Sequence, residues 1–448
     1  MHNSVTVESW CGESCSKNIF VSKIESLDRD KLEEYQLAKF RNMLGSILET
    51  NLFYRKKLDT VGLRNPADIQ TLSDYRQIPF TTKDQLSADQ SASPPYGTNL
   101  TFMPSEYIRV HQTSGTTGAP LRWLDDAESW TWWGRCWTSV YHAAGVLPND
   151  RIFFAFSFGP FIGFWSAHEG ARQIGALSIP GGGMSSLQRV QAICSNKITV
   201  LVCTPTYALH LGEVAQSEGI NIVDSNVRVT IHAGEPGASL PSTKKQIETI
   251  WGAQCYDHTG ATEVGAWGFE CESQTGVHLN EGEFICEVID PETGDPAEEG
   301  ELVITNLGRI GMPIIRYRSG DQVRLQTGIC PCGRQFRRLD SGVIGRIDDI
   351  LIVRGVNIYP SAIENVLRSF PQIIEFAVDV HRQGVLDEVE IRLEINELEE
   401  SADQIVEEVK KTCRQNLGVR VDVKVVGLGQ LPRFELKSRR FTDHRINK

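Results

Sequence analysis

The sequence predicts an α/β fold, with a large N-terminal domain of mixed sheets and helices and a small α+β C-terminal domain. The chain has 448 residues, which is too long for one ordinary core. Between residues 105 and 305, short β-branched or aromatic runs alternate with helical or glycine-rich stretches, as in α/β layers. After residue 346 the pattern changes to that of a separate small unit.

The large domain begins with a helical pattern over residues 27–60, where Asp28 and Asp30 place negative charge near the helix start. Pro79 and residues 81–84 predict a turn into another short helix. Five later runs predict strands, at residues 152–156, 199–203, 227–232, 284–289 and 301–305.

The small domain is predicted to span residues 346–448, which leaves 1–345 for the large domain. Its boundary lies between Asp340 and Asp349. A helix is expected just after Pro360, a favourable residue for a helix start. The expected elements are strands at 350–353, 376–380, 389–395 and 421–426, and helices at 361–369 and 402–417.

The composition excludes several classes of partner. The net charge of −12 disfavours nucleic acid, and the basic cluster at residues 437–440 is interpreted as a solvated tail. No basic start with an apolar run opens the chain, and no apolar stretch reaches the roughly 18 residues that span a bilayer. We therefore expect a cytoplasmic protein without a membrane partner, whose eleven cysteines are mostly reduced thiols.

A glycine and hydroxyl loop follows the apolar–polar alternation at residues 107–110. Its glycines would let backbone N–H groups approach a phosphate, and its hydroxyls would add hydrogen bonds. The loop lacks the Gly-Lys-Ser/Thr ending of a Walker motif. The residues concerned are Ser114, Gly115, Thr116, Thr117 and Gly118.

This loop, with Pro120, resembles the signature loop of the adenylate-forming superfamily. Four further segments resemble that superfamily's motifs in the same order: residues 259–263, 317–321, 345–349 with 354–355, and Lys437. A closer resemblance, to the phenylacetate–CoA ligases, is carried by residues 51–55, 78–84, 234–236, 332–334 and 354–360.

The resemblance implies ATP-dependent activation of a small aromatic carboxylic acid as an acyl-adenylate, followed by transfer to CoA. It implies Mg²⁺ at Glu263, contact of Thr262 with the α-phosphate, and Lys437 as the catalytic lysine. Asp348 is the implied hinge between the domains. The other implied ATP- and AMP-binding residues are Gly234, Glu235, Pro236, His258, Thr259, Gly260, Asp321 and Arg346.

Three positions depart from the superfamily pattern. Leu121 and Arg122 stand where a lysine often follows the loop, and Leu436 replaces the glycine before Lys437. Thr259 replaces the tyrosine that stacks near adenine in the superfamily. His258 or Tyr256 is then the candidate for lining one side of the adenine site.

The acid pocket is predicted from the aromatic run at residues 153–161, because aromatic walls suit a flat apolar ring. Aromatic runs are also common in protein cores, so that interpretation stays open. The candidate pocket residues are Phe156, Phe158, Phe161, His168, Ala233 and Trp267.

Three cysteines and one histidine form a candidate structural zinc site. Zinc favours four sulfur and imidazole ligands, and two of the cysteines lie in a Gly/Pro loop that is a poor place for core thiols. Zinc at matching positions is also implied by the resemblance. The residues are Cys271, His278, Cys330 and Cys332.

Two other functions remain open on these motifs. In the first, the acyl group passes to a carrier-protein thiol or to an amine rather than to CoA, because all of these enzymes share the adenylation motifs. A silent binding or regulatory protein on the same fold is the third interpretation. The resemblance also suggests a homodimer, by analogy alone.

Overall fold

The computed structural model describes residues 21–113, 120–353, 356–383, 386–396, 402–434 and 439–445. The predicted phosphate loop at residues 114–118 and Lys437 lie outside these described residues. Among the described residues, no helix is long and apolar enough to cross a membrane.

The N-terminal helical pattern forms two helices rather than the single helix expected over residues 27–60. Asp28 caps α1 (Arg29–Thr50), and Asn51 then ends that helix and caps α2 (Leu52–Asp59) by accepting from the backbone N–H of Tyr54. Two further helices follow, α3 (Leu72–Arg76) and α4 (Lys83–Ala92). The second of these is the helix expected after Pro79.

Half of the large sheet is parallel. Its strands run in the spatial order β4 (Leu177–Pro180), β3 (Arg151–Phe154), β5 (Val200–Cys203), β6 (Val229–His232) and β7 (Gln254–Ala261). Residues 152 and 154 of β3 pack with the α5 side, whereas Phe153 packs with the opposite side. Burial on both faces explains why these strands read as continuous apolar runs.

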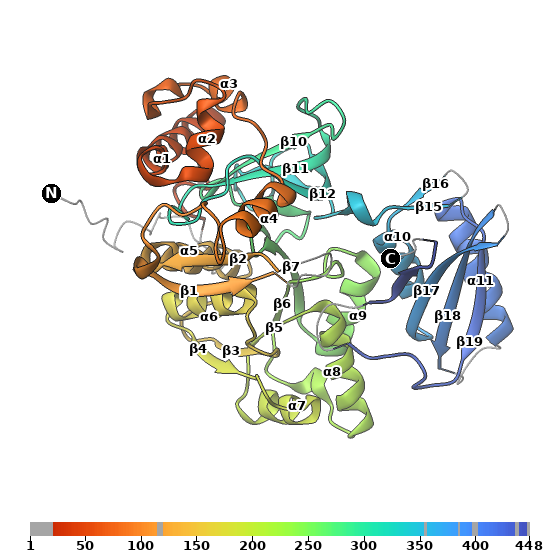
Figure 1. Ribbon diagram of the computed structural model, residues 1–448. Helices are drawn as coiled ribbons and strands as arrows, with labels where there is room; N and C mark the ends of the chain where they lie inside the picture. Colours follow the sequence, from red (N-terminus) through yellow and green to blue (C-terminus); the bar gives the residue numbers. More distant parts are fainter. Residues whose placement is uncertain are drawn as a thin grey trace.

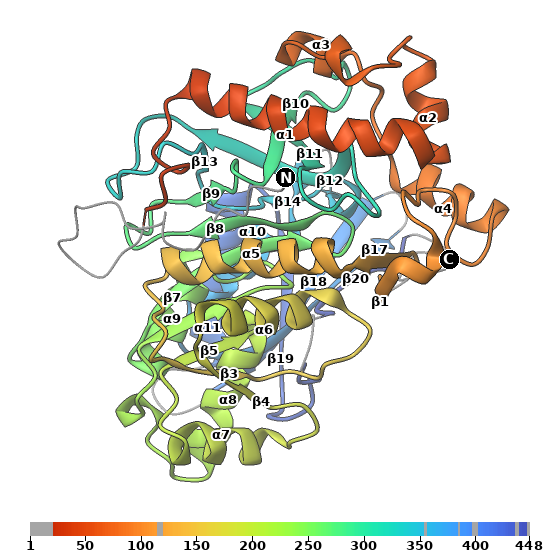
Figure 2. The same cartoon turned by 90° about the vertical axis from the view of Figure 1, so that its left-hand side faces the viewer.

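Helices cover both faces of this parallel half (Figures 1 and 2). On one face lie α5 (Ala127–Ala143) and α6 (Ile162–Ile174). On the other lie α7 (Ser186–Ser195), α8 (Pro205–Ser217) and α9 (Pro241–Trp251). The α/β prediction is confirmed.

The rest of the sheet is antiparallel. Beyond β7 it continues with β8 (Gly265–Glu270), β9 (Val277–Leu279), β13 (Arg338–Leu339), β12 (Tyr317–Gln326), β11 (Glu299–Asn306) and β10 (Phe284–Ile289). The short β14 (Gly345–Arg346) pairs with β12. A separate hairpin is formed by β1 (Tyr107–Gln112) and β2 (Arg122–Asp126), which in sequence lie on either side of the predicted phosphate loop.

A second core begins after the large sheet ends, and Figure 1 shows its elements beside α9. It contains the hairpin β15 (Leu351–Val353) and β16 (Val356–Ile358), and the helices α10 (Pro360–Arg368) and α11 (Ala402–Leu417). Its sheet has the order β19 (Val421–Val426), β18 (Leu386–Ile395), β17 (Ile373–Gln383) and β20 (Phe441–Asp443). The division at residue 345 stays a prediction.

Candidate active site and metal centre

The predicted nucleotide and acid residues follow parallel strands of the large sheet. Residues 155–161 follow β3, residues 233–236 follow β6, and residues 258–263 lie at the end of β7. Residues 204–206, which the sequence analysis did not name, follow β5 between them. The carboxyl ends of parallel strands meet at one edge of a sheet, where α/β proteins bind ligands. The topology therefore brings four separate sequence segments to one candidate site.

The loop after β6 carries three predicted adenine-binding residues. Gly234 has φ +97°, a conformation that favours glycine. The Glu235 carboxylate accepts a hydrogen bond from the backbone N–H of Thr206 at 3.0 Å, which ties this loop to the start of α8. Gly234 and Pro236 are exposed, so their surface is available to a ligand.

The turn that carries Thr262 and Glu263 is held by a buried arginine. Arg309 donates to the carbonyl oxygens of Thr262 at 3.0 Å and Glu263 at 3.3 Å. It also forms a two-bond ion pair with Asp125, at 2.7 and 2.8 Å, and both side chains are fully buried. Trp123 and Trp133 lie within 5.1 and 5.3 Å of the guanidinium.

The electrostatics of this pair favour its charged form. Burial of Asp125 opposes ionisation, but the charge and hydrogen bonds of Arg309 and of His111 together outweigh burial and lower the pKa of the carboxyl. Sequence reasoning missed this role for Arg309. The only sequence signal is that Arg309 opens a Gly- and Arg-rich stretch just before the motif at 317–321.

The predicted ribose acceptor and the predicted hinge residue share one arginine. Arg346 donates to Asp348 at 2.8 and 3.2 Å, to the carbonyl oxygen of Ser319 at 2.9 Å, and weakly to Asp321 at 3.4 Å. Burial disfavours the Asp348 carboxylate, yet its bond from Arg346 lowers the pKa below the usual range. Arg346 therefore links Asp348, the predicted hinge residue, to Asp321, the predicted ribose acceptor.

The residues proposed to replace the missing adenine-wall tyrosine are packed inside the protein. His258 is buried, with its ring 4.3 Å from that of Trp137, and burial lowers its pKa to about 4. Tyr256 is buried as well. Thr259 faces Gly268, where an added Cβ would lie 2.1 Å from the Thr259 hydroxyl. Gly260 is exposed, and the assignment of these residues to adenine stays a prediction.

The predicted acid-pocket aromatics form one cluster after β3. Phe156 stacks on Phe164, and Phe158 lies edge-on to Trp165 at 4.8 Å. His168 lies 6.0 Å from Phe158. Sequence reasoning missed Phe164 and Trp165, although their helical spacing from His168 was a possible signal.

The other three predicted pocket residues lie around or away from this cluster. Phe161 is the residue before α6, and Ala233 is half-buried where β6 ends. Trp267 is fully buried in the core that β8 shares with α5. Its part in an acid pocket stays a prediction.

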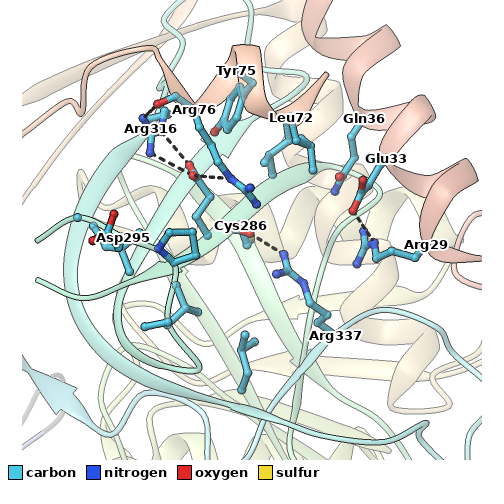
Figure 3. Close-up of a pocket in the computed structure, with 18 residues that line it drawn as sticks. Arg29, Glu33, Gln36, Leu72, Tyr75, Arg76, Cys286, Asp295, Arg316 and Arg337 are labelled. Atoms are coloured by element: carbon cyan, nitrogen blue, oxygen red, sulfur yellow. Dashed lines mark hydrogen bonds and ion pairs between the residues drawn. The ribbon is translucent and has the colours of Figure 1, made fainter. Parts of the chain in front are cut away.

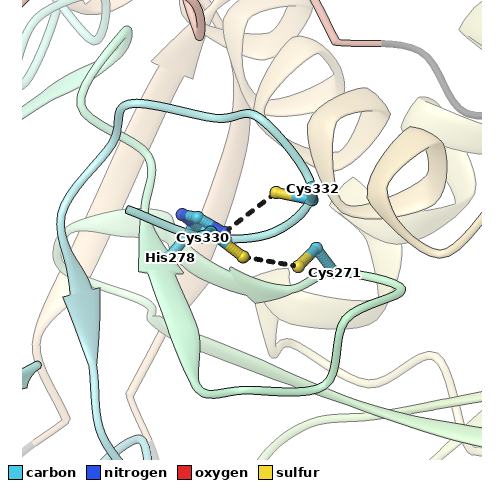
Figure 4. Close-up of side chains that lie close together, drawn as sticks. All are labelled: Cys271, His278, Cys330 and Cys332. Carbon is cyan, nitrogen blue, oxygen red and sulfur yellow. Dashed lines mark hydrogen bonds between the residues drawn. The ribbon is translucent and has the colours of Figure 1, made fainter. Parts of the chain in front are cut away.

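The predicted metal ligands come together at one point of the large domain (Figure 4). The ligand atoms of Cys271, His278, Cys330 and Cys332 all lie within 4.8 Å of one another. The Cys271 and Cys330 sulfurs are 3.6 Å apart, and the Cys332 sulfur lies 3.5 Å from His278 Nε2. His278 Nδ1 lies 3.1 Å from the carbonyl oxygen of Phe336, which orients the ring.

One of these thiols is strongly biased toward the thiolate, the form that binds metals. Hydrogen bonds from Cys271 and then from His278 lower the pKa of Cys332 far below its ordinary value. The cluster therefore has the donor chemistry of a metal site.

A cavity of about 360 Å³ lies apart from the candidate site, between α1, α3 and β10 (Figure 3). Its lining contains none of the predicted site residues. Arg316 pairs with Glu287 at 3.0 Å and Arg337 pairs with Glu281 at 2.9 Å, so these charges are already compensated.

Known proteins match both the sequence and the structure. Residues 355–445 match the family model of the AMP-binding enzyme C-terminal domain. The phenylacetate-coenzyme A ligase of Thermus thermophilus is 32% identical over 93% of this chain and 97% of its own length. That of Escherichia coli is also 32% identical, over 96% of this chain and 98% of its own.

A solved 2-hydroxyisobutyryl-CoA ligase, 29% identical, adopts the same fold. In its postadenylation state it superposes with a TM-score of 0.91, covering 98% of this chain and 94% of that one. In its thioesterification state, with CoA, the TM-score is 0.72 over 96% of this chain and 93% of that one. The chain belongs to the phenylacetate–CoA ligase family of AMP-forming enzymes, which activate an acid with ATP and transfer it to CoA.

Proposed function

We propose that the acid is aromatic, in the class of phenylacetate. The observation that carries this proposal is the aromatic cluster of Phe156, Phe158, Phe164 and Trp165, at the same sheet edge as the loop that carries Glu235. Aromatic walls suit a flat apolar ring. The chain matches two phenylacetate-coenzyme A ligases over almost their full length, which supports the same class of acid.

In the first half-reaction, an acid carboxylate oxygen attacks the α-phosphorus of ATP and the bond to pyrophosphate breaks. Negative charge builds on the phosphate oxygens, so donors and cations must surround them. We assign Thr262 to the α-phosphate and Lys437 to the acid carboxylate. Glu263 would hold Mg²⁺, which supplies positive charge at the phosphates when bound. Asp321 would accept from the ribose hydroxyls.

In the second half-reaction, the CoA sulfur attacks the acyl carbon and AMP leaves. The large-domain residues would hold the adenylate in both steps. Their proposed task needs a fixed geometry, and the buried Arg309 supports it because it binds the backbone at both Thr262 and Glu263.

A panel of acids tests the substrate class. The enzyme is incubated with ATP, Mg²⁺ and phenylacetate, benzoate or 2-hydroxyisobutyrate, and pyrophosphate is measured before and after CoA is added. We expect the highest kcat/KM with an aromatic acid, together with its CoA thioester. A preference for 2-hydroxyisobutyrate would refute the aromatic pocket, and pyrophosphate without thioester would favour a carrier-protein or amine acceptor.

The cysteine and histidine cluster is proposed to hold structural Zn²⁺. Zinc bonds of about 2.3 Å to sulfur and about 2.0 Å to nitrogen, in a tetrahedron, place ligand atoms roughly 3.5–3.8 Å apart. The 3.6 Å between the Cys271 and Cys330 sulfurs and the 3.5 Å between the Cys332 sulfur and His278 Nε2 are close to that spacing. All four ligands come from the protein, which is typical of structural rather than catalytic zinc.

Metal analysis of protein purified without chelators tests this proposal. We expect about one zinc per chain, lost in Cys332→Ser but retained in Cys194→Ser, a thiol outside the cluster. Equal zinc content in these two variants, or none in the parent, would refute the site.

A further inference from the structure

The small domain contacts α8 and α9 of the large domain through a few polar bonds. Gln246 donates to the carbonyl oxygen of Arg368 at 2.8 Å. Arg433 lies 3.3 Å from Glu213, and Arg440 donates to the Thr206 hydroxyl at 3.1 Å. The last of these bonds has a buried donor and leads directly toward the candidate site.

Arg440 is aimed by its own domain. Only 3% of the residue is exposed, and its guanidinium donates to both oxygens of Glu375 at 2.6 and 2.9 Å. The Phe376 ring lies 5.1 Å away, and Glu364 lies 3.5 Å from Nη1. Glu375 and Glu364 hold the guanidinium of Arg440 in one orientation. In that orientation, Nη1 also donates to the Thr206 hydroxyl of the large domain.

Thr206 connects this contact to the predicted adenine loop. It lies in the first turn of α8, and its backbone N–H donates to Glu235 at 3.0 Å. Glu235 stands between Gly234 and Pro236 in the loop after β6. A continuous path of hydrogen bonds therefore runs from Glu235 through Thr206 to Arg440.

The contact belongs to one arrangement of the two domains. The chain superposes on a 2-hydroxyisobutyryl-CoA ligase with TM-score 0.91 in the postadenylation state and 0.72 in the thioesterification state. Arg440 and Glu375 lie in the small domain and would move together, whereas Thr206 stays with the large domain. A rotation that moves the small domain away from α8 would break the bond to Thr206 and would leave the ion pair of Arg440 with Glu375 intact.

The charges at this contact suit an interface that opens and closes. Glu364 and Glu375 balance Arg368 and Arg440 within the small domain, so separation would expose a neutral cluster rather than an unpaired charge. Polar interfaces of this kind allow domain motion.

We propose that Arg440 is a positioning residue for adenylation, which holds the small domain through Thr206 in the arrangement that resembles the relative's postadenylation state. Arg440 lies three residues after Lys437 in sequence, so this bond anchors the chain next to the lysine that the first half-reaction needs. The inference rests on the proposed role of Lys437.

Thr206→Val tests the proposal without disturbing the small domain. It removes the hydroxyl that Arg440 contacts but keeps the volume, the backbone bond to Glu235 and the Arg440 ion pair. Thr206→Ser is the matched control, because it retains the hydroxyl. Single-turnover rates are measured for adenylation of phenylacetate by ATP and, separately, for CoA attack on synthetic phenylacetyl-adenylate.

We expect Thr206→Val to slow adenylation about tenfold, within the range of coupling between sites, and to leave thioester formation unchanged or faster. Thr206→Ser should keep both parental rates. Equal rates in the Val and Ser variants, or equal slowing of both half-reactions by Thr206→Val, would overturn the proposal.

Hydrogen exchange without substrates gives a second readout that does not depend on the identity of the acid. Residues 439–443 should exchange faster in Thr206→Val than in Thr206→Ser. Unchanged exchange would overturn the proposal. If the parent is inactive with every acid, the proposed function fails, while the exchange difference still decides the role of Arg440.

Discussion

The two sides of the candidate site are built in opposite ways. On the large domain, the turn of Thr262 and Glu263 is held by Arg309, which is fully buried and paired with Asp125. On the small domain, docking depends on separate polar bonds such as those of Arg433 and Arg440. One side is fixed by the core, and in our proposal the other is released between the two half-reactions.

The difference follows from the chemistry of two successive steps. In the proposed mechanism, the adenylate stays in place while a different group, first Lys437 and then CoA, is brought to it. A rigid large-domain side serves both half-reactions. A small domain that could not move away would block CoA in the second. Polar contacts between balanced charges cost little to break, which suits the moving side.

Arg309→Met should have the largest effect, because it leaves Asp125 buried without its partner. We expect a loss of about 3–5 kcal/mol in the free energy of unfolding, measured with urea. A double variant with Asp125→Asn should recover part of that loss. A loss below about 1 kcal/mol would show that the fixed wall does not depend on this pair.

Lys437→Ala should affect the moving side alone. Removing one cation at the developing phosphate charge costs roughly 100- to 1,000-fold in rate, and we expect that loss in adenylation. Thioester formation from synthetic phenylacetyl-adenylate should be retained. Adenylation at the parental rate would show that the lysine is assigned wrongly.

Asp257, next to His258 on the fixed side, should make stability depend on pH. Burial raises its pKa from 3.8 to about 7 in the folded protein, so the folded state holds a proton that the unfolded state has released. This contribution is complete below pH 3.8 and is lost as the pH rises through about 7. Asp257→Asn should therefore stabilise the protein at pH 8 by about 2 kcal/mol. It should also make the urea midpoint depend less on pH between pH 5 and 8. An unchanged pH profile would contradict the buried carboxyl.

Glu213→Gln should have the smallest effect. Its ion pair with Arg433 joins the two domains, and the side chains of Arg433 and Glu213 are 26% and 36% exposed, respectively. Such pairs contribute below about 1 kcal/mol, so adenylation should fall by less than about fivefold, and high salt should abolish the difference from the parent. A tenfold loss that persists in salt would mean that this contact, and not Arg440, carries the docking.

The sequence predicted regular elements on both sides: in the small domain, α11 (Ala402–Leu417) and β19 (Val421–Val426) have the expected bounds. Apolar runs identified β3, β5, β6, β10 and β11 to within a few residues, because strands buried on both faces leave a strong local signal. The three-residue β20 was missed, since its pairing with β17 is set by contacts 63 residues away in sequence, between Val378 and Phe441.

Within the site, motif residues were predictable but their supports were not. The four metal-cluster residues were named from sequence and lie together in the structure. Arg309 was not, because nothing local distinguishes a buried arginine from a surface one until its partner, Asp125, is placed beside it. The break at Asn51 was missed because helical spacing continues across the residue that caps the next helix.

The most direct test measures both half-reactions in two variants side by side. Arg309→Lys weakens the support of the Thr262 and Glu263 turn on the fixed side. Thr206→Val removes a bond that holds the small domain, the moving side. With phenylacetate, ATP and CoA, we expect Arg309→Lys to slow adenylation and thioester formation together and Thr206→Val to slow adenylation alone. If both variants change the two rates in the same ratio, the division into a fixed and a moving side is wrong.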